Sequence, residues 1–164
     1  MKSIAILWNA MNPFFEEAIN DISKFVVIES LEYVEFKDYR QFIKDIYALD
    51  TGTGKPGYSD YKADIMVDKY DSNQICILYL LLPPSEKKYI DRKDTFIYEN
   101  IEILKQFIRK KYKTKVENYS FDNVFHMTDD EKEYDFVLNV INRHLLENTD
   151  RKEKGLIKKW CTFV

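Results

Sequence analysis

Glycine is scarce in this chain of 164 residues, which contains only four. Three of them, Gly52, Gly54 and Gly57, lie in the single stretch TGTGKPG, whose spacing does not fit the P-loop pattern. Almost no glycine is left for phosphate-binding turns elsewhere in the chain. A phosphate site in this protein must therefore be built mostly from side chains and helix ends.

Cysteine, long apolar runs and an excess of positive charge are also lacking. Cys76 and Cys161 have no CxxC spacing, so we expect neither a disulfide framework nor a zinc knuckle, and the cytoplasm is the expected location. The longest apolar run, residues 75–82, is far shorter than the roughly 20 residues of a membrane-spanning helix, so no membrane association is expected. A net charge of −3 argues against a nucleic-acid partner.

The composition is that of a folded domain. Hydrophobic residues make up 45% of the chain and aromatic residues 15%, so a sizeable core can form, while 32% charged residues can cover its surface. We expect a single domain over residues 1–146, followed by a charged C-terminal tail over residues 147–164.

Short β-prone runs alternate with segments of helical periodicity. The β-branched and aromatic runs predict strands over residues 3–8, 25–36, 74–82 and 116–125. Capping signals and apolar spacing predict four helices. The first begins at Asn12, the second spans residues 38–47, and the third begins at Asp94 or Thr95. The fourth begins at a Thr128–Glu131 capping box and runs to about residue 146. Residues 50–60 are expected to form a loop. This alternation predicts an α/β or α+β sandwich, with the helices on one face of a sheet as the simplest case.

Two histidines are present, and one of them lies where chemistry is expected. His144 falls within a predicted helix, where a packed or surface side chain is the simplest interpretation. His126 ends an apolar segment two residues before a predicted helix start, in the sequence NVFHMTDDE. The N–H groups and the positive dipole end of that helix would stabilise a phosphoryl group on His126. Arg109 can add a guanidinium that binds phosphate oxygens in a bidentate manner.

A longer pattern surrounds these two residues. An Ile108-Arg109 pair is followed by Tyr112 and Val116, and then by N123-x-x-H126-x-T128-D129-x-E131. This pattern resembles the nucleoside diphosphate kinases, mainly between Arg109 and Ile141. The resemblance implies a ferredoxin-like sandwich, with a mostly antiparallel sheet and helices packed on it. It also implies a magnesium nucleotide as ligand, phosphoryl transfer through a phosphohistidine, and assembly into homo-oligomers.

By position, the resemblance makes His126 the catalytic nucleophile and Arg109, Asn123 and Thr128 nucleotide and phosphate ligands. Arg92 is a further phosphate-binding candidate, because its interval from Arg109 matches that between the two arginines of the family. Tyr47 answers to a tyrosine in the nucleotide-stacking region of the family. No metal ligand is assigned, because acids at residues 129–131 are expected in a first helical turn in any case.

Three hypotheses are open at this point. In the first, the chain binds a magnesium nucleoside di- or triphosphate and transfers a phosphoryl group through His126. In the second, it is a catalytically inactive binding or interaction module that retains the fold. No lysine lies near residues 7–9 and Met127 follows the histidine, whereas the family has a lysine and a glycine there; both differences favour the second hypothesis. In the third, an unrelated α/β domain packs His126 beneath a capped helix.

Overall fold

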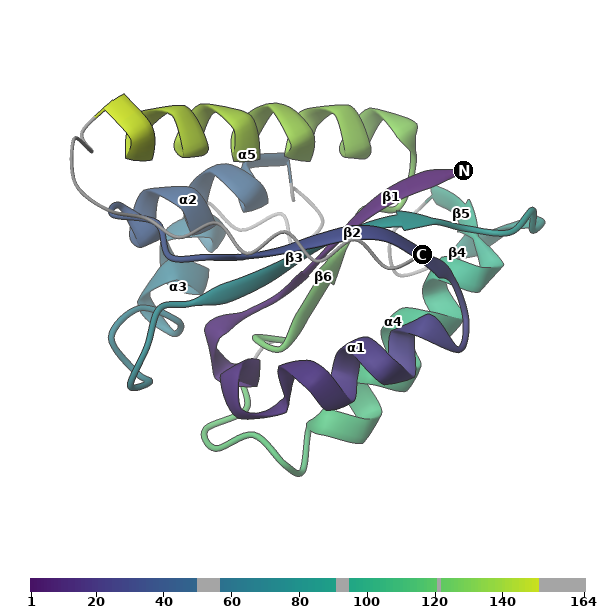
Figure 1. Cartoon of the computed structure of the whole chain (residues 1–164). Coiled ribbons are helices and arrows are strands. Elements are labelled where there is room, and N and C mark those ends of the chain that lie inside the picture. Colours follow the sequence, from purple (N-terminus) through teal and green to yellow (C-terminus); the bar gives the residue numbers. More distant parts are fainter. Residues whose placement is uncertain (50–56, 91–94, 121, 151–164) are drawn as a thin grey trace.

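A four-stranded sheet lies between two layers of helices (Figure 1). The computed structural model describes residues 1–49, 57–90, 95–120 and 122–150. The sheet consists of β1 (Lys2–Leu7), β2 (Val27–Val34), β3 (Ile75–Leu81) and β6 (Phe125–Met127), in the order β2-β3-β1-β6 with antiparallel neighbours throughout. Helices α1 (Phe15–Ser23) and α4 (Glu99–Tyr112) cover one face. The other face carries α2 (Tyr39–Ile46), α3 (Tyr58–Asp64) and α5 (Glu131–Asp150).

This strand order, with α1 and α4 as the crossover helices, is the ferredoxin-like arrangement. The predicted fold class is therefore confirmed. The simplest arrangement, with helices on one face only, is wrong, because α2, α3 and α5 cover the second face. The strands predicted over residues 3–8, 25–36 and 74–82 are present: β1 is shifted by one residue, and β2 and β3 are shorter than predicted.

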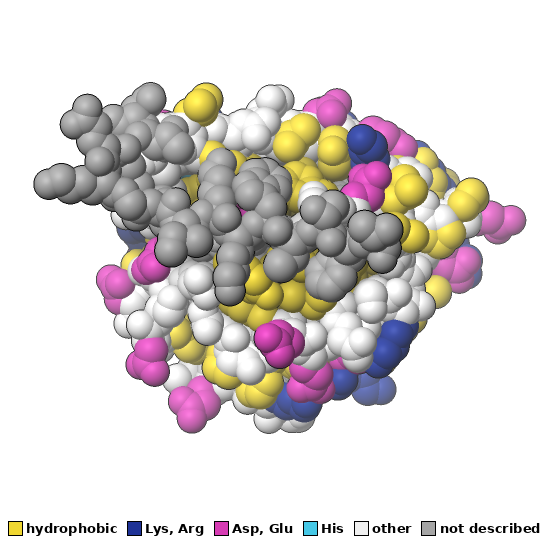
Figure 2. All heavy atoms as spheres, viewed as in Figure 1, with side chains coloured by type: hydrophobic (Ala, Val, Ile, Leu, Met, Phe, Trp, Pro, Cys, Tyr) yellow, Lys and Arg dark blue, Asp and Glu magenta, His cyan; other side chains and the backbone are white. Residues whose placement is uncertain are grey.

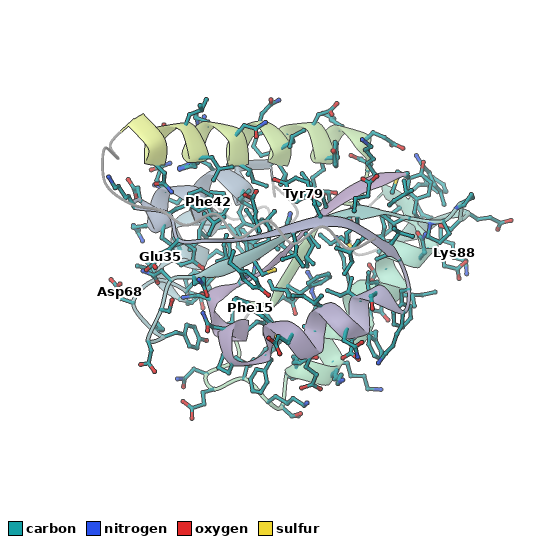
Figure 3. All side chains as sticks on the ribbon, in the orientation of Figure 1. Phe15, Glu35, Phe42, Asp68, Tyr79 and Lys88 are labelled. Carbon is teal, nitrogen blue, oxygen red and sulfur yellow. The ribbon has the colours of Figure 1, made fainter. Side chains whose placement is uncertain are left out.

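The central strand β1 is buried on both faces. Ala5 and Leu7 point into the core beneath α1 and α4, whereas Ile4, Ile6 and Trp8 lie in the core beneath α2 and α5. Figure 3 labels one aromatic residue of each core, Phe15 and Phe42, on opposite sides of the sheet. A strand covered on both faces is apolar in every position instead of alternating, which explains the run from Ile4 to Trp8.

The first helical segment differs from its prediction. Residues Asn9–Phe14 form a 3-10 helix that contains Pro13, and α1 begins only at Phe15. Asn12 caps no helix; its side-chain amide instead donates to Gln74 Oε1 at 3.4 Å. The tight turn buries Asn9, whose amide group bonds to the Met66 carbonyl and accepts the Tyr39 hydroxyl.

The helix predicted to open at Asp94 or Thr95 begins at Glu99, after a hairpin that sequence periodicity missed. The hairpin pairs β4 (Lys87–Ile90) with β5 (Thr95–Tyr98), and Lys88, labelled in Figure 3, lies on β4. The run TFIY is β-branched and aromatic, which favours a strand. Residues 91–94, including Arg92, lie outside the described residues.

Two further segments also differ. The strand predicted over 116–125 is wrong except for its last residue: β6 begins at Phe125 and runs to Met127, because Asn118 and Asp122 adopt left-handed backbone conformations that interrupt a ladder. Within the predicted loop 50–60, residues 50–56 lie outside the described part, and α3 begins at Tyr58 after Gly57 at φ +83°. Helix α5 runs to Asp150, beyond the predicted end near 146, and residues 151–164 are not described.

The edge strand β2 leaves apolar side chains at the surface. Val27 of β2 is 60% exposed, and Tyr33 of β2 and Leu81 of the neighbouring strand β3 are exposed as well. Figure 2 shows a patch of apolar side chains just below the middle of the same face. Among the described helices, none is both long enough and apolar enough to cross a membrane.

A buried ion cluster joins α1 to α4. Asp21 is buried and accepts hydrogen bonds from Lys24, Lys111 and the Tyr112 hydroxyl. Burial alone raises the pKa of Asp21, but these three hydrogen bonds outweigh it and hold the pKa at about 2, below the ordinary 3.8. Ionised Asp21 therefore stabilises the folded state.

The stabilisation by Asp21 is expected to be complete above pH 4 and to disappear as the pH falls through about 2. The shift in pKa corresponds to roughly 2 kcal/mol. Asp21→Asn should lower the free energy of unfolding at pH 7 by a similar amount, measured by urea denaturation. Glu17→Gln is the matched control, because Glu17 binds the same Lys111 at the surface, where an ion pair contributes little, so its loss should be clearly smaller. Equal losses in both variants would contradict the assignment.

Candidate functional site

Strand β6 positions His126 at the free edge of the sheet. His126 pairs with Ile6 of β1, so its side chain lies on the face covered by α2 and α5. The residue is only 8% exposed. Its ring meets the Tyr47 ring edge-on, with centroids 5.4 Å apart and an interplanar angle of 79°.

A carboxylate from α5 faces the imidazole. Glu133 Oε1 lies 3.5 Å from His126 Nε2, while Glu133 Oε2 accepts a hydrogen bond from the Asp129 backbone N–H at 2.6 Å. The backbone bond fixes the carboxylate in place. His126 Nε2 is buried and makes no hydrogen bond within the described part of the chain.

Two cationic side chains of α4 reach the same edge. Lys105 and Arg109 are four residues apart and therefore share one face of the helix. Arg109 donates to the Phe125 carbonyl at 3.2 Å and lies 3.4 Å from Asp122, and its Nε is buried without a hydrogen-bond partner among the described residues. Lys105 is buried and forms an ion pair with Asp129. A third cation, Lys62, comes from α3 and lies 5.2 Å from the Tyr47 ring centroid.

These surroundings keep His126 neutral. Burial is the largest effect and lowers the pKa of His126 well below its ordinary value; the charges of Lys105, Arg109 and Lys62 lower it further, against an opposing effect of Asp129. At neutral pH the ring therefore carries one protonated nitrogen and one nitrogen with a free lone pair. A neutral imidazole among cations can act as a nucleophile toward an anionic group.

The start of α5 is capped differently from its prediction. Asp130 Oδ1 accepts from the Glu133 N–H at 2.8 Å, so Asp130 is the capping residue, and the Thr128–Glu131 box is wrong. The physical reason is that β1 already binds the Thr128 hydroxyl. Thr128 Oγ1 accepts from the Ile4 N–H at 3.1 Å and lies 2.9 Å from the Ser3 hydroxyl.

The predicted phosphate ligands are not all brought together. Arg109 lies beside His126, as the sequence indicates. The Asn123 amide is directed elsewhere: it donates to the Tyr70 hydroxyl at 2.8 Å and accepts from the Ser120 N–H at 3.2 Å. Thr128 is buried against β1. Arg92 is outside the described residues, so its role as a phosphate ligand stays a prediction.

The surroundings of His144 indicate a role in packing. Its Nε2 lies 2.7 Å from Asp45 Oδ2, and its ring packs edge-on against Phe36 and Phe42 (Phe42 is labelled in Figure 3). Burial raises the pKa of Asp45, but hydrogen bonds from His144 and Gln41 outweigh it and leave the pKa below its ordinary value. The interpretation of His144 as a packed side chain agrees with this setting.

Sequence reasoning missed two of the three cations around His126. Lys105 precedes Arg109 by one helical turn, a spacing that could have found it. Lys62 has no comparable signal, because α3 meets β6 only through tertiary packing.

No group of three or more His, Cys, Asp or Glu side chains in the described ranges is arranged to hold a metal ion. Asp129 and Asp130, which follow His126 closely in the sequence, are already engaged by Lys105 and by the helix cap.

The fold and the site together define a ferredoxin-like sandwich with a histidine on its edge strand. The chain is similar in structure to the nucleoside diphosphate kinase of Aquifex aeolicus, with a TM-score of 0.50 and 13% identity over 85% of this chain and 93% of that one. It is also similar to the nucleoside diphosphate kinase of Borrelia burgdorferi with bound vanadate and ADP, with a TM-score of 0.48 and 10% identity over 85% of each chain.

No protein-family model and no curated protein matches the sequence. The likeness to the Aquifex enzyme is therefore one of fold, and the chain has a divergent nucleoside-diphosphate-kinase-like fold. The fold that the motif resemblance implies is confirmed.

The burial of Thr128 leads to a stability prediction. Thr128→Val removes the acceptor of the Ile4 N–H in a buried setting and should lower the free energy of unfolding by about 1–3 kcal/mol. Thr128→Ser keeps the hydroxyl and is the control, with a smaller loss. Urea denaturation at pH 7 measures both, and a valine variant as stable as the wild type would show that the hydroxyl does not hold β6 to β1.

Proposed function

We propose that the chain binds the phosphates of a magnesium nucleoside di- or triphosphate at the edge of β6 and transfers a phosphoryl group through His126. The observation that supports this most is the position of Lys105 and Arg109 beside a buried, neutral imidazole. A cationic setting around a neutral nucleophile favours an incoming phosphate chain and the charge that develops on it during transfer.

The proposed transfer uses the two nitrogens differently. Glu133 beside Nε2 favours the tautomer with the proton on Nε2, which leaves the lone pair on Nδ1. In the forward step Nδ1 forms a bond to the terminal phosphorus, and the bond from that phosphorus to its bridging oxygen breaks. A nucleoside diphosphate leaves with the electron pair. The reverse reaction with a second diphosphate returns the phosphoryl group and restores the imidazole.

Arg109 is the proposed phosphate ligand with the clearest donors. Its guanidinium now meets the Phe125 carbonyl and Asp122, and a phosphate oxygen can replace Asp122, which lies at the longer distance of 3.4 Å. For Asn123 and Thr128 we propose a supporting role, because their polar groups bond within the fold. Magnesium would arrive with the nucleotide on its phosphate oxygens, since Asp129 and Asp130 are already paired.

The proposal predicts that radiolabelled ATP with magnesium gives protein-bound phosphate that is labile in acid and stable in base. His126→Ala should abolish the label, because it removes the nucleophile, and Glu133→Gln should reduce its yield by at least several-fold, because it weakens the orientation of the ring. His144→Gln is the matched control, since His144 is the second of two histidines, and it should keep the label. Label that persists in His126→Ala would refute the role of His126.

A second candidate function is an inactive binding or interaction module. Trp8 favours it: this residue follows β1, in the region where the resemblance leads us to expect a lysine, and its indole donates to the Tyr47 hydroxyl at 3.1 Å. The near-complete burial of His126 also favours it. Calorimetry without any magnesium-nucleotide binding, together with a stable hetero-complex in a pull-down, would select this candidate over the first.

We also infer that the chain forms a homo-oligomer. The edge strand β2, with exposed Val27 and Tyr33, is suited to pair with a second copy. Light scattering coupled to size exclusion should give at least a dimer, and Val27→Lys should shift it to monomer. Leu146→Lys replaces an exposed apolar residue on α5 and serves as the control. A wild-type monomer at all concentrations would contradict self-association.

A further inference from the structure

Strand β2 lies at one end of the sheet, in the order β2-β3-β1-β6. No strand among the described residues pairs with its outer side, so its outward backbone N–H and C=O groups have no ladder partner in that part of the chain. Such an edge is a template for another extended segment, and proteins commonly cover it. An extended partner for the outer side of β2 is therefore expected.

Helix α5 ends beside the C-terminal end of this strand. The side chain of Asn148 donates to the Glu35 carbonyl at 3.3 Å and accepts from the Lys37 N–H at 3.2 Å. Glu35 directly follows β2, and the yellow end of α5 lies on the same side of the molecule as this end of β2 in Figure 1. A segment that follows α5 and returns along β2 would therefore run antiparallel to it, as neighbouring strands do throughout this sheet.

The sequence after α5 contains a stretch that suits this position. Residues 156–164, LIKKWCTFV, lie outside the described residues. They are rich in β-branched and aromatic side chains and include no proline, which favours a strand. The stretch has nine residues and β2 has eight, so at about 3.4 Å per residue it is long enough to follow the whole of β2. Residues 151–155, which end in a glycine, provide the connection from α5.

The charges of the two segments are complementary. Glu29 and Glu32 lie in the middle of β2, and the Glu29 side chain is exposed. Lys158 and Lys159 lie in the middle of the C-terminal stretch. In an antiparallel arrangement the two lysines come to the middle of β2, where the two glutamates lie. Opposite charges on paired strands stabilise the pairing.

Apolar side chains are exposed where the C-terminal stretch would end. Val27 begins β2, and Leu81 lies opposite it on β3; both are exposed. Phe25 packs against Phe107 of α4 with ring centroids 5.0 Å apart, and both rings are partly exposed. Antiparallel pairing brings residues 160–164, which include Trp and Phe, to this end of the strand. Their apolar surface would be buried there together with that of β2 and α4.

We propose that residues 156–164 pair with β2 as an antiparallel edge strand of the same chain and cover the free edge of the sheet. The self-association inferred above uses this same edge, so the C-terminal stretch and a second copy compete for β2. The competition, unlike the pairing itself, rests on the proposed function. The stretch thereby raises the concentration at which copies of the chain associate.

A disulfide trap on the full chain tests the pairing. With Leu156 opposite Val34, Cys161 lies beside Glu29. Residues directly opposite in an antiparallel pair have Cα atoms about 4.5–5.5 Å apart, which is within the range of a disulfide. Oxidised glutathione should therefore close a disulfide within one chain in Glu29→Cys. Glu35→Cys is the matched control, because it replaces an exposed glutamate at the other end of the strand and should not react with Cys161.

Mass spectrometry and a non-reducing gel give the result. We expect Glu29→Cys to lose two thiols at unchanged molecular size. Cys76 does not compete, because it is buried and burial raises its pKa to about 12. No disulfide in Glu29→Cys, faster closure in Glu35→Cys, or a disulfide that joins two copies would each overturn the pairing.

A charge reversal tests the same pairing without new cysteines. Lys158→Glu combined with Lys159→Glu places like charges along β2, whereas Lys152→Glu combined with Lys154→Glu makes the same change in charge outside the stretch. In dilute solution the first pair should speed hydrogen exchange in β2 by about ten-fold or more, and the second pair should leave it unchanged. Equal exchange in both variants would contradict the pairing.

Light scattering on the same variants tests the competition. The reversal at 158 and 159 should lower the concentration at which the chain dimerises, because it frees the edge of β2. A wild type that dimerises, with no stronger dimer in this variant, overturns the competition. A wild type and variants that all stay monomeric contradict self-association, and the disulfide trap then decides the pairing alone.

Discussion

The pairing of β6 with β1 is the contact on which the candidate site depends. β6 has only three residues, and its one neighbour in the sheet is β1. Beyond the ladder, the Thr128 hydroxyl binds the Ile4 N–H, and Arg109 binds the Phe125 carbonyl on the opposite edge. These bonds fix the register of β6 and therefore the face of the sheet on which the His126 side chain lies. A shift by one residue would turn the side chain to the other core.

Electrostatics then gives this strand its chemical character. Cations from α3 and α4 surround the imidazole, and burial keeps it uncharged. Glu133 is held by a backbone N–H and is directed at the ring. Asp130 caps α5 and Asp129 pairs with Lys105, so neither carboxylate is available to bind a metal ion. The arrangement favours a ligand that brings its own negative charge and its own cation.

Much of the fold could be predicted from sequence, and the errors have physical causes. β1, β2, β3 and α2 follow strong local patterns, and Asp38, the first residue of the predicted helix 38–47, caps α2. Residues 95–98 were ambiguous because Ile97 fits both the alternation of a strand and the apolar stripe of α4. The sequences T-x-x-E and D-x-x-E overlap at residues 128–133, and only the tertiary bond of Thr128 to β1 decides between them. His126 and Arg109 were found by their motif, whereas Lys62 depends on how α3 docks, which no local pattern encodes.

The position of β1 in the sheet also has a consequence for the order of events during folding. Its partners are distant in sequence: Ile4 bonds to Thr128 across 124 residues. Contacts of such separation close large loops and form slowly. During synthesis β1 leaves the ribosome before the other strands of the sheet, yet its second neighbour emerges only after α4. His126 can therefore reach its final surroundings only when nearly the whole domain is available, so the candidate site cannot be assembled until most of the domain has been synthesised.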